Sequence, residues 1–141
     1  MNQVYMDTGV FILAHFLSGF NTCYYVVRWK TGKDIRELYS QATGAKNVGR
    51  VLGKRGFYVT FFGDFFKGYF LIFLASSILV EPQFVPWILI ALILGHVYPC
   101  QLNFKGGKGI AVFMGGAIAN LRGFNFIASY PSLIVCLLLI F

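Results

Sequence analysis

Charge, and acidic charge above all, is what this sequence has least of. Only 12% of its 141 residues are charged and Asp and Glu together number five, whereas 57% are hydrophobic and the mean hydropathy is +0.69. So little charge does not suit the surface of a water-soluble domain of this length. The composition therefore excludes a soluble globular protein and indicates an integral membrane protein.

Cysteine is also scarce, and its spacing has no pattern. Cys23, Cys100 and Cys136 are odd in number, far apart and inside apolar runs. This is neither a disulfide framework nor a zinc site, so we expect three small buried hydrophobic side chains. We predict no metal and no cofactor.

Basic residues are missing before the first apolar run, residues 8–27, so a cleaved signal peptide is not expected. Further apolar runs lie at 57–80, 87–104, 110–121 and 123–141. The run at 110–121 gives only about 18 Å of helix, short of a hydrocarbon core of roughly 30 Å. We predict an all-α polytopic membrane protein, a single domain over 1–141 with about five membrane helices, one of them short. Because the chain ends on apolar residues without a polar anchor, we expect that a C-terminal part is missing.

The basic residues that are present gather in one segment. Eight of the twelve lie between Arg28 and Arg55, directly after the first apolar run. The positive-inside rule places this segment in the cytoplasm and the N-terminus outside. The net charge of +7 therefore reflects a cytoplasmic loop, and we expect no nucleic acid as partner.

A glycine-rich segment, Lys105-Gly106-Gly107-Lys108-Gly109, stands between two apolar runs. Glycine lets backbone N–H groups approach a phosphate, lysine adds charge, and the next helix offers its N-terminus. No Lys-Ser/Thr pair follows, which excludes a nucleotide P-loop. Pro99 should end the preceding helix and leave His96 within reach of the same ligand. An ordinary turn between two membrane helices fits these residues equally well.

A second polar segment runs from Ser40 to Arg50. Four residues can donate hydrogen bonds, Ser40, Thr43, Asn47 and Arg50, and the guanidinium can hold a phosphate in bidentate fashion. Lys46 would add a point charge. The alternative is a solvated basic loop attracted to anionic lipid headgroups.

Asp64 and Lys67 interrupt the apolar run at 57–80. Three residues apart on a helix, they share a face and can form an ion pair. Such a pair at membrane depth normally faces protein or a polar cavity, whereas near the interface the lysine can snorkel to the headgroups. We expect Asp64 to orient a lysine or arginine and not to act as a catalytic base.

These segments, together with Asp34-Ile35-Arg36, Gly95-His96 and Pro99, come in the order and spacing of a known family. The sequence resembles the bacterial acyl-phosphate-dependent glycerol-3-phosphate acyltransferases of the PlsY family. The resemblance implies a multi-pass enzyme of the bacterial inner membrane that needs no cofactor. It would move a fatty acyl group from acyl phosphate to the 1-hydroxyl of glycerol 3-phosphate, giving lysophosphatidic acid for phospholipid biosynthesis.

The same resemblance implies the residues of the site. Catalytic roles fall on Ser40, Asn47 and Arg50. Binding of glycerol 3-phosphate falls on the second motif and its neighbouring histidine, which comprise Lys105, Gly106, Gly107, Lys108, Gly109 and His96.

The sequence also departs from the family pattern. Gln41 and Ala42 stand where the first motif usually has glycine and asparagine, and Val112 replaces the threonine that closes the second motif. The third family motif, with histidine and asparagine, is not reached. Two other readings therefore stay open: a non-catalytic remnant that still binds glycerol 3-phosphate, and a small transporter or channel subunit with Asp64, Lys67 and His96 along its pathway.

Overall fold

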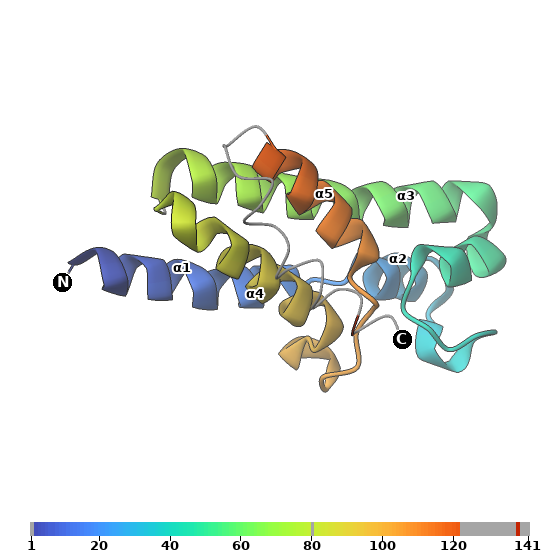
Figure 1. Cartoon of the computed structure of the whole chain (residues 1–141). Coiled ribbons are helices and arrows are strands. Elements are labelled where there is room, and N and C mark those ends of the chain that lie inside the picture. Colours follow the sequence, from blue (N-terminus) through green and yellow to red (C-terminus); the bar gives the residue numbers. More distant parts are fainter. Residues whose placement is uncertain (1, 80, 122–137, 139–141) are drawn as a thin grey trace.

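The structure, a computed structural model, describes residues 2–79, 81–121 and 138. Within these residues every regular element is helical, which confirms the expected all-α class. The helices are α1 (Asn2–Ser18), α2 (Thr22–Thr31), α3 (Ala45–Leu74), α4 (Val85–Val97) and α5 (Ile110–Leu121) (Figure 1). Short helical turns join them: η1 (Ile35–Glu37), η2 (Ala75–Leu79), η3 (Pro82–Phe84) and η4 (Cys100–Leu102).

Three stretches of the described chain are long and apolar enough to cross a membrane: Val4–Thr31, Ala45–Ser77 and Pro82–Leu102. Helix α5 is shorter and apolar, and its bounds agree with the short run predicted at 110–121. Apart from Leu138, the predicted run at 123–141 lies outside the described residues.

The first apolar run lies in a stretch long enough to cross a membrane, as predicted, but it is not one continuous helix over 8–27. Helix α1 ends at Ser18, and α2 begins at Thr22. Asn21 caps α2, because its side chain accepts a hydrogen bond from the Tyr24 amide at 3.2 Å. An asparagine that bonds the backbone in this way favours a helix start over a continuous helix. The signal for the break was therefore present in the sequence.

The sequence predicted that the second polar segment, Ser40 to Arg50, is a loop. This prediction is only partly right, because the second half of the segment is helical. Helix α3 begins at Ala45, so Asn47 and Arg50 lie on its first turns. Gly53 interrupts the helical path with φ +73°, a conformation that glycine adopts without strain. The start of α3 therefore turns away from the long remainder of the helix (Figure 1).

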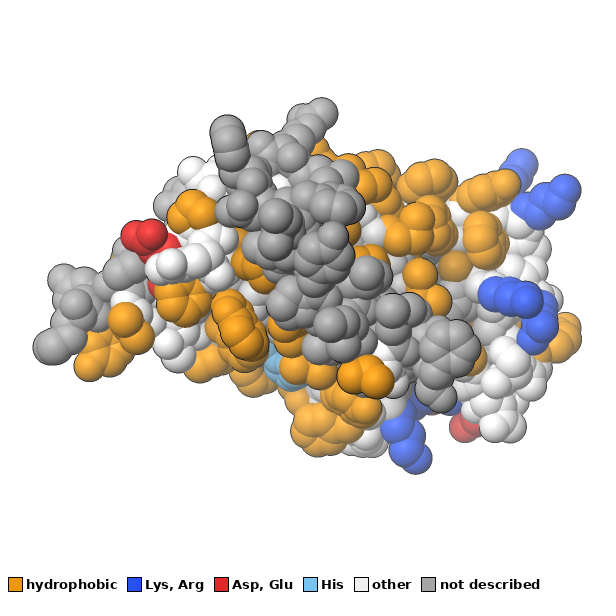
Figure 2. All heavy atoms as spheres, in the orientation of Figure 1, with side chains coloured by type: hydrophobic (Ala, Val, Ile, Leu, Met, Phe, Trp, Pro, Cys, Tyr) orange, Lys and Arg blue, Asp and Glu red, His pale blue; other side chains and the backbone are white. Residues whose placement is uncertain are grey.

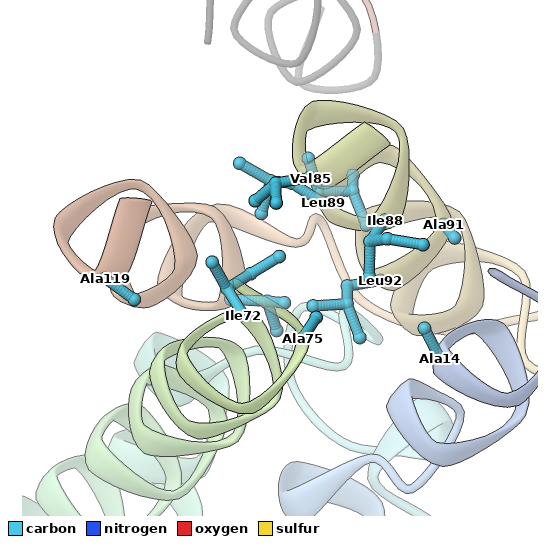
Figure 3. Close-up of a cluster of buried hydrophobic side chains, with 11 residues drawn as sticks. Ala14, Ile72, Ala75, Val85, Ile88, Leu89, Ala91, Leu92 and Ala119 are labelled. Carbon is cyan, nitrogen blue, oxygen red and sulfur yellow. The ribbon is translucent and has the colours of Figure 1, made fainter. Parts of the chain in front are cut away.

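The core lies around α4, which is buried along nearly its whole length (Figure 3). Ile88, Leu89 and Leu92 of α4 meet Ile72 of α3 and Ala14 of α1. Since α4 is covered by its neighbours, its C-terminal end, where His96 lies, is held inside the bundle.

Helix α5 packs more extensively on α3 than on any other described helix. Glycines allow the two backbones to touch: a Cβ at Gly115 would collide with the carbonyl of Phe65, and one at Gly68 with the carbonyl of Val112. Small residues at a helix crossing permit this close approach in membrane proteins. The contact fixes the N-terminus of α5 beside the middle of α3.

The expectation of buried cysteines is met in part. Cys23 is buried, but Cys100 is exposed in η4, so the prediction is wrong there. Cys136 lies outside the described residues.

Candidate functional site

The two polar segments, more than fifty residues apart in sequence, line one cavity of about 890 Å³. From the first segment come Ser40, Asn47, Arg50 and the residues between Ser40 and Asn47. From the second come Lys105, Gly106, Gly107, Lys108 and Gly109, followed by Ile110 and Ala111 of α5. Arg36, Phe61, Asp64 and His96 complete the wall. All nine residues singled out from the sequence therefore meet in one place.

The cavity is strongly cationic. Its basic lining residues are Arg36, Lys46, Arg50, Lys105 and Lys108. Figure 2 shows lysine and arginine gathered over the end of the molecule that carries α2 and the start of α3. A cleft lined by one sign of charge concentrates ligands of the opposite sign. In the described part of the chain no group of His, Cys, Asp and Glu is arranged to hold a metal ion.

Asn47 shapes the first segment from within. Its side chain is 2% exposed, and its amide nitrogen donates to the carbonyls of Leu38 and Ala42, both at 3.0 Å, with a longer contact to Ile35 at 3.4 Å. Its amide oxygen accepts from the backbone N–H of Ser40 at 3.3 Å. Because both ends of the amide bond the protein, Asn47 holds the loop that carries Ser40 rather than facing the cavity with a free donor.

The loop around Ser40 is sharply bent. Tyr39 and Gln41, on either side of this serine, have φ of +46° and +58°, the left-handed region that side chains other than glycine rarely adopt. Gln41 stands where the family motif usually has glycine. The bend leaves Ser40 exposed on the cavity wall.

Arg50 and Lys46 lie four residues apart on the first turns of α3, and both are exposed. At this spacing two side chains point the same way on a helix. Neither forms an ion pair with any described residue. Both charges are thus available to a ligand.

The glycine-rich segment is held by the end of α4. Gly106 and Gly107 donate their N–H groups to the carbonyls of Val97 and His96, at 3.0 and 3.1 Å. Helix α4 ends at Val97, as Pro99 predicted, and its last carbonyls have no partner one turn later. Two glycine N–H groups are therefore committed to α4, which corrects the expectation that the glycines turn them toward a ligand.

The glycines are required by contact with their neighbours. A Cβ at Gly107 would collide with His96 Nε2 and the carbonyl of Thr43, and one at Gly106 with the carbonyl of His96. Gly109 has φ +74° and turns the chain into α5. The amides of the first turn of α5 lack an intrahelical acceptor, and this helix N-terminus lies at the cavity, where it favours an anion.

The buried pair on α3 formed as expected. Lys67 Nζ lies 3.4 Å from Asp64 Oδ1, and the two side chains are 11% and 6% exposed. The ammonium also donates to the carbonyls of Ser18 and Phe20, so it does not snorkel to the surface. His96, which is 3% exposed, lies 3.1 Å from the lysine through Nδ1.

Several lining residues were not among the predicted site residues, and three of them stand out. Arg36 belongs to a segment that carried the family resemblance, and it joins the two halves of the site by donating to the carbonyl of Leu102 at 2.9 Å. Phe61 lies one turn before Asp64 on α3. Thr43 is 4% exposed and its hydroxyl has no hydrogen-bond partner among the described residues. The sequence had indicated Thr43 as a possible hydrogen-bond donor, and the structure adds that its hydroxyl is buried and unpaired.

The fold and the cavity define the class: an α-helical membrane protein with a cationic site at one end of its bundle. The sequence profile of the glycerol-3-phosphate acyltransferase family matches residues 8–141. The chain belongs to this family.

Individual relatives agree with this assignment. Glycerol-3-phosphate acyltransferase 1 of Bacillus cereus is 43% identical over 111 residues, which are 78% of this chain and 61% of the relative. The protein of the same name from Desulfitobacterium hafniense is 40% identical over 113 residues, covering 80% of this chain and 56% of the relative. This chain thus spans about three fifths of the length of the relatives that it matches.

Solved structures match as well. The crystal structure of PlsY, an integral membrane glycerol 3-phosphate acyltransferase, in its glycerol 3-phosphate form, aligns with a TM-score of 0.73 and 32% identity. The lysophosphatidic acid form of PlsY aligns with a TM-score of 0.69 and 30% identity. Each alignment covers 94% of this chain and 60% of the solved chain.

Proposed function

We propose that this protein transfers a fatty acyl group from acyl phosphate to the 1-hydroxyl of glycerol 3-phosphate, giving lysophosphatidic acid and phosphate. One observation carries the proposal: the two motif segments of the family line one cavity of about 890 Å³ with five basic side chains. Both substrates are phosphorylated, and a cavity of this size has room for two phosphate groups. The lipid bilayer would supply the acyl donor and receive the product.

In this proposal the protein acts by positioning and charge. Phosphate is already an adequate leaving group of acyl phosphate, so no covalent nucleophile is needed. Arg50, Lys105 and Lys108 would hold the phosphates, and the N-terminus of α5 would add its partial charge. Orientation of two substrates and stabilisation of developing charge account for large rate enhancements in enzymes.

Ser40 and Asn47 would take different parts. Ser40 is exposed on the cavity and has no His–carboxylate pair beside it in sequence, so we assign its hydroxyl as a hydrogen-bond donor to a substrate. Asn47 would act through Ser40, whose backbone it holds. His96, Gly106, Gly107 and Gly109 would form the wall against which glycerol 3-phosphate lies.

We place the cavity at the cytoplasmic face of the bacterial inner membrane and the N-terminus outside. Basic residues flank the cytoplasmic ends of membrane helices. The lysines and arginines of residues 28–55, together with Lys105 and Lys108, all belong to the segments at the cavity end. A cysteine accessibility assay in intact cells tests this, with single cysteines placed at Lys33 and at Gln83. Labelling of the Gln83 variant alone by an impermeant reagent is expected, and the opposite pattern would overturn the orientation.

The activity is tested by supplying the purified chain with acyl phosphate and labelled glycerol 3-phosphate. We expect labelled lysophosphatidic acid, and we expect Arg50→Ala and Lys108→Ala each to weaken binding of glycerol 3-phosphate by about tenfold or more, the worth of one charge-assisted hydrogen bond. Arg55→Ala, which removes an exposed charge outside the cavity wall, is the matched control. Retained binding in both cavity variants would refute their roles.

A non-catalytic remnant that still binds glycerol 3-phosphate is the second candidate, because Gln41 and Ala42 stand where the first family motif usually has glycine and asparagine. Binding of glycerol 3-phosphate without turnover would support the remnant and overturn the enzyme. Solute or ion flux through proteoliposomes that contain the chain would instead support a transporter.

Thr43 offers a sharper test of the binding site. Thr43→Val removes the buried hydroxyl of a cavity-lining residue, which has no partner among the described residues, while keeping the volume of the side chain. Thr60 is also buried with an unpaired hydroxyl, but it does not line the cavity. We expect Thr43→Val to weaken binding of glycerol 3-phosphate and Thr60→Val to leave it unchanged. Equal behaviour of the two variants would exclude Thr43 from the ligand contacts.

A further inference from the structure

The break between α1 and α2 is closed by the charged pair of α3. Lys67 Nζ donates to the carbonyls of Ser18 at 2.9 Å and Phe20 at 2.8 Å, where α1 ends. Asp64 Oδ1 accepts from the amide of Thr22 at 3.4 Å, where α2 begins. A cation at a helix C-terminus and an anion at a helix N-terminus both oppose the local dipole charge. The pair thus stabilises a helix break that would otherwise leave backbone groups unsatisfied at membrane depth.

The same lysine reaches across to α4. Its ammonium lies 3.1 Å from Nδ1 of His96, and Asp64 Oδ1 lies 3.9 Å from that ring nitrogen. An ammonium group carries donors only, so Nδ1 must accept in this contact. A neutral imidazole that accepts at Nδ1 carries its proton on Nε2. The contact with Lys67 therefore selects the tautomer of His96.

The other side of the ring faces the glycine-rich segment. His96 lines the cavity, whereas Lys67 does not. A side chain at Gly107 would collide with Nε2 of His96, which places this nitrogen directly against the segment that we assign to glycerol 3-phosphate. The selected tautomer therefore presents an N–H donor on the side of the ring that meets the cavity wall.

We propose that Lys67 is a positioning residue, which fixes the ring and the tautomer of His96 so that Nε2–H donates a hydrogen bond to the phosphorylated ligand in the cavity. The proposal rests on the function proposed above. Asp64 supplies the charge that keeps Lys67 in place. In return, Lys67 neutralises the carboxylate of Asp64, which lines the cavity and would otherwise repel a phosphorylated ligand. The contacts of this pair with the end of α1, the start of α2 and His96 of α4 would then all help to position one hydrogen-bond donor of the site, Nε2–H of His96.

The first test is a measurement of the tautomer, which needs no activity. The chain has two histidines, so His15→Gln leaves His96 alone. Ring ¹⁵N chemical shifts of this variant, labelled with ¹⁵N-histidine, should report a proton on Nε2 and none on Nδ1. A proton on Nδ1, or on both nitrogens, would overturn the proposal.

The second test separates positioning from stability. Lys67→Met alone would leave Asp64 as a buried unpaired charge and disturb folding. The double variant Asp64→Asn with Lys67→Met removes the pair without that defect, and Lys67→Arg keeps a donor toward Nδ1. In a turnover assay we expect the double variant to raise KM for glycerol 3-phosphate by about tenfold with little change in kcat, as for one lost hydrogen bond to a charged ligand. Lys67→Arg should recover part of the loss.

The outcomes can be told apart from failure of the proposed function. Calorimetry of wild-type protein with glycerol 3-phosphate decides whether the ligand binds at all. If it binds, an unchanged dissociation constant in a folded double variant would overturn the role of Lys67. If the double variant does not fold, the ring shifts of His96 in the otherwise unaltered chain decide the question.

Discussion

The two halves of the cavity wall are held in opposite ways. The segment around Ser40 is held by a side chain, since the buried amide of Asn47 bonds three carbonyls and one N–H group of that loop. The segment from Lys105 to Gly109 is held by its backbone, through two N–H groups that bond the end of α4 and through glycines that admit no side chain. The first half should therefore fail when a side chain is removed, and the second when one is added.

Removing the amide of Asn47 should have the largest effect, because this side chain holds the first half of the cavity wall. Asn47→Ala would remove the amide's bonds to the carbonyls of Leu38 and Ala42, which keep one backbone donor each, and would take away the acceptor of the Ser40 N–H. We expect it to destabilise the protein by about 3 kcal/mol, since each lost hydrogen bond costs about 1 kcal/mol and a buried donor left without an acceptor roughly 1–3 kcal/mol. Binding of glycerol 3-phosphate should fall as well, because Ser40 loses its support. Thermal unfolding in detergent and calorimetry would measure both effects.

Gln101→Ala is the control for this variant. It removes one exposed amide, which donates to the carbonyl of Phe16 at 3.1 Å, so its effect should be small. If Asn47→Ala kept full stability and binding but lost turnover, Asn47 would be a catalytic residue and not a structural one.

Adding one methyl group should break the second half. Gly107→Ala places a Cβ against His96 Nε2 and the carbonyl of Thr43, and such overpacking costs about 1–3 kcal/mol. We expect lower thermal stability and weaker binding of glycerol 3-phosphate. Gly9→Ala is the matched control, because its Cβ would meet no atom within 4 Å. Normal stability and affinity of Gly107→Ala would show that the close contact with α4 is not needed.

Much of the fold followed from hydrophobic runs, because their length and the position of Pro99 are local properties. The start and end of α5 agreed with the run at 110–121, and α4 ended before its proline. The break at residues 19–21 and the early start of α3 were missed. Both depend on polar backbone contacts, the cap by Asn21 and the bend at Gly53, which a count of apolar residues does not register.

The site was found by the chemistry of its residues, but their roles were harder to predict. Asn47 and Arg50 look alike in sequence as hydrogen-bond donors, yet one is buried in its own loop and the other is exposed on the cavity. Likewise, the glycine content predicted N–H groups that are free to bind a ligand, but two of these groups donate hydrogen bonds to carbonyls at the end of α4. Which partner a polar group finds is decided by tertiary contacts, and these do not appear in a local motif.

Arg36 links the chain just before Ser40 to the turn just before Lys105, through the carbonyl of Leu102, and acid should loosen that link. Arg36 hydrogen-bonds Asp34 and holds the pKa of that carboxyl below its usual value, with help from its own backbone N–H. The folded pKa is lowered, so the stabilisation is complete above the ordinary aspartate pKa and is lost as pH falls through the folded value. We expect wild type to exceed Asp34→Asn in stability by about 1 kcal/mol near neutral pH, as for a partly exposed charged pair, and by less in acid. Unfolding of both proteins at several pH values measures this, and a pH-independent difference would contradict it.

The smallest predicted effect concerns the bend beside Ser40. Gln41 has φ +58°, a conformation that costs a side chain about 1–2 kcal/mol relative to glycine, and glycine stands at this place in the usual family motif. Gln41→Gly should relieve that strain but lose more chain entropy on folding, so we expect a net gain of about 0.5 kcal/mol. Gln41→Ala keeps the strain and serves as the control. Thermal unfolding of the three proteins would rank glycine highest, and a lower stability of the glycine variant would mean that the glutamine side chain itself supports the loop. In that case the side-chain support of the first half would extend from Asn47 to its neighbour in the bend, and the contrast with the backbone-held second half would be sharper still.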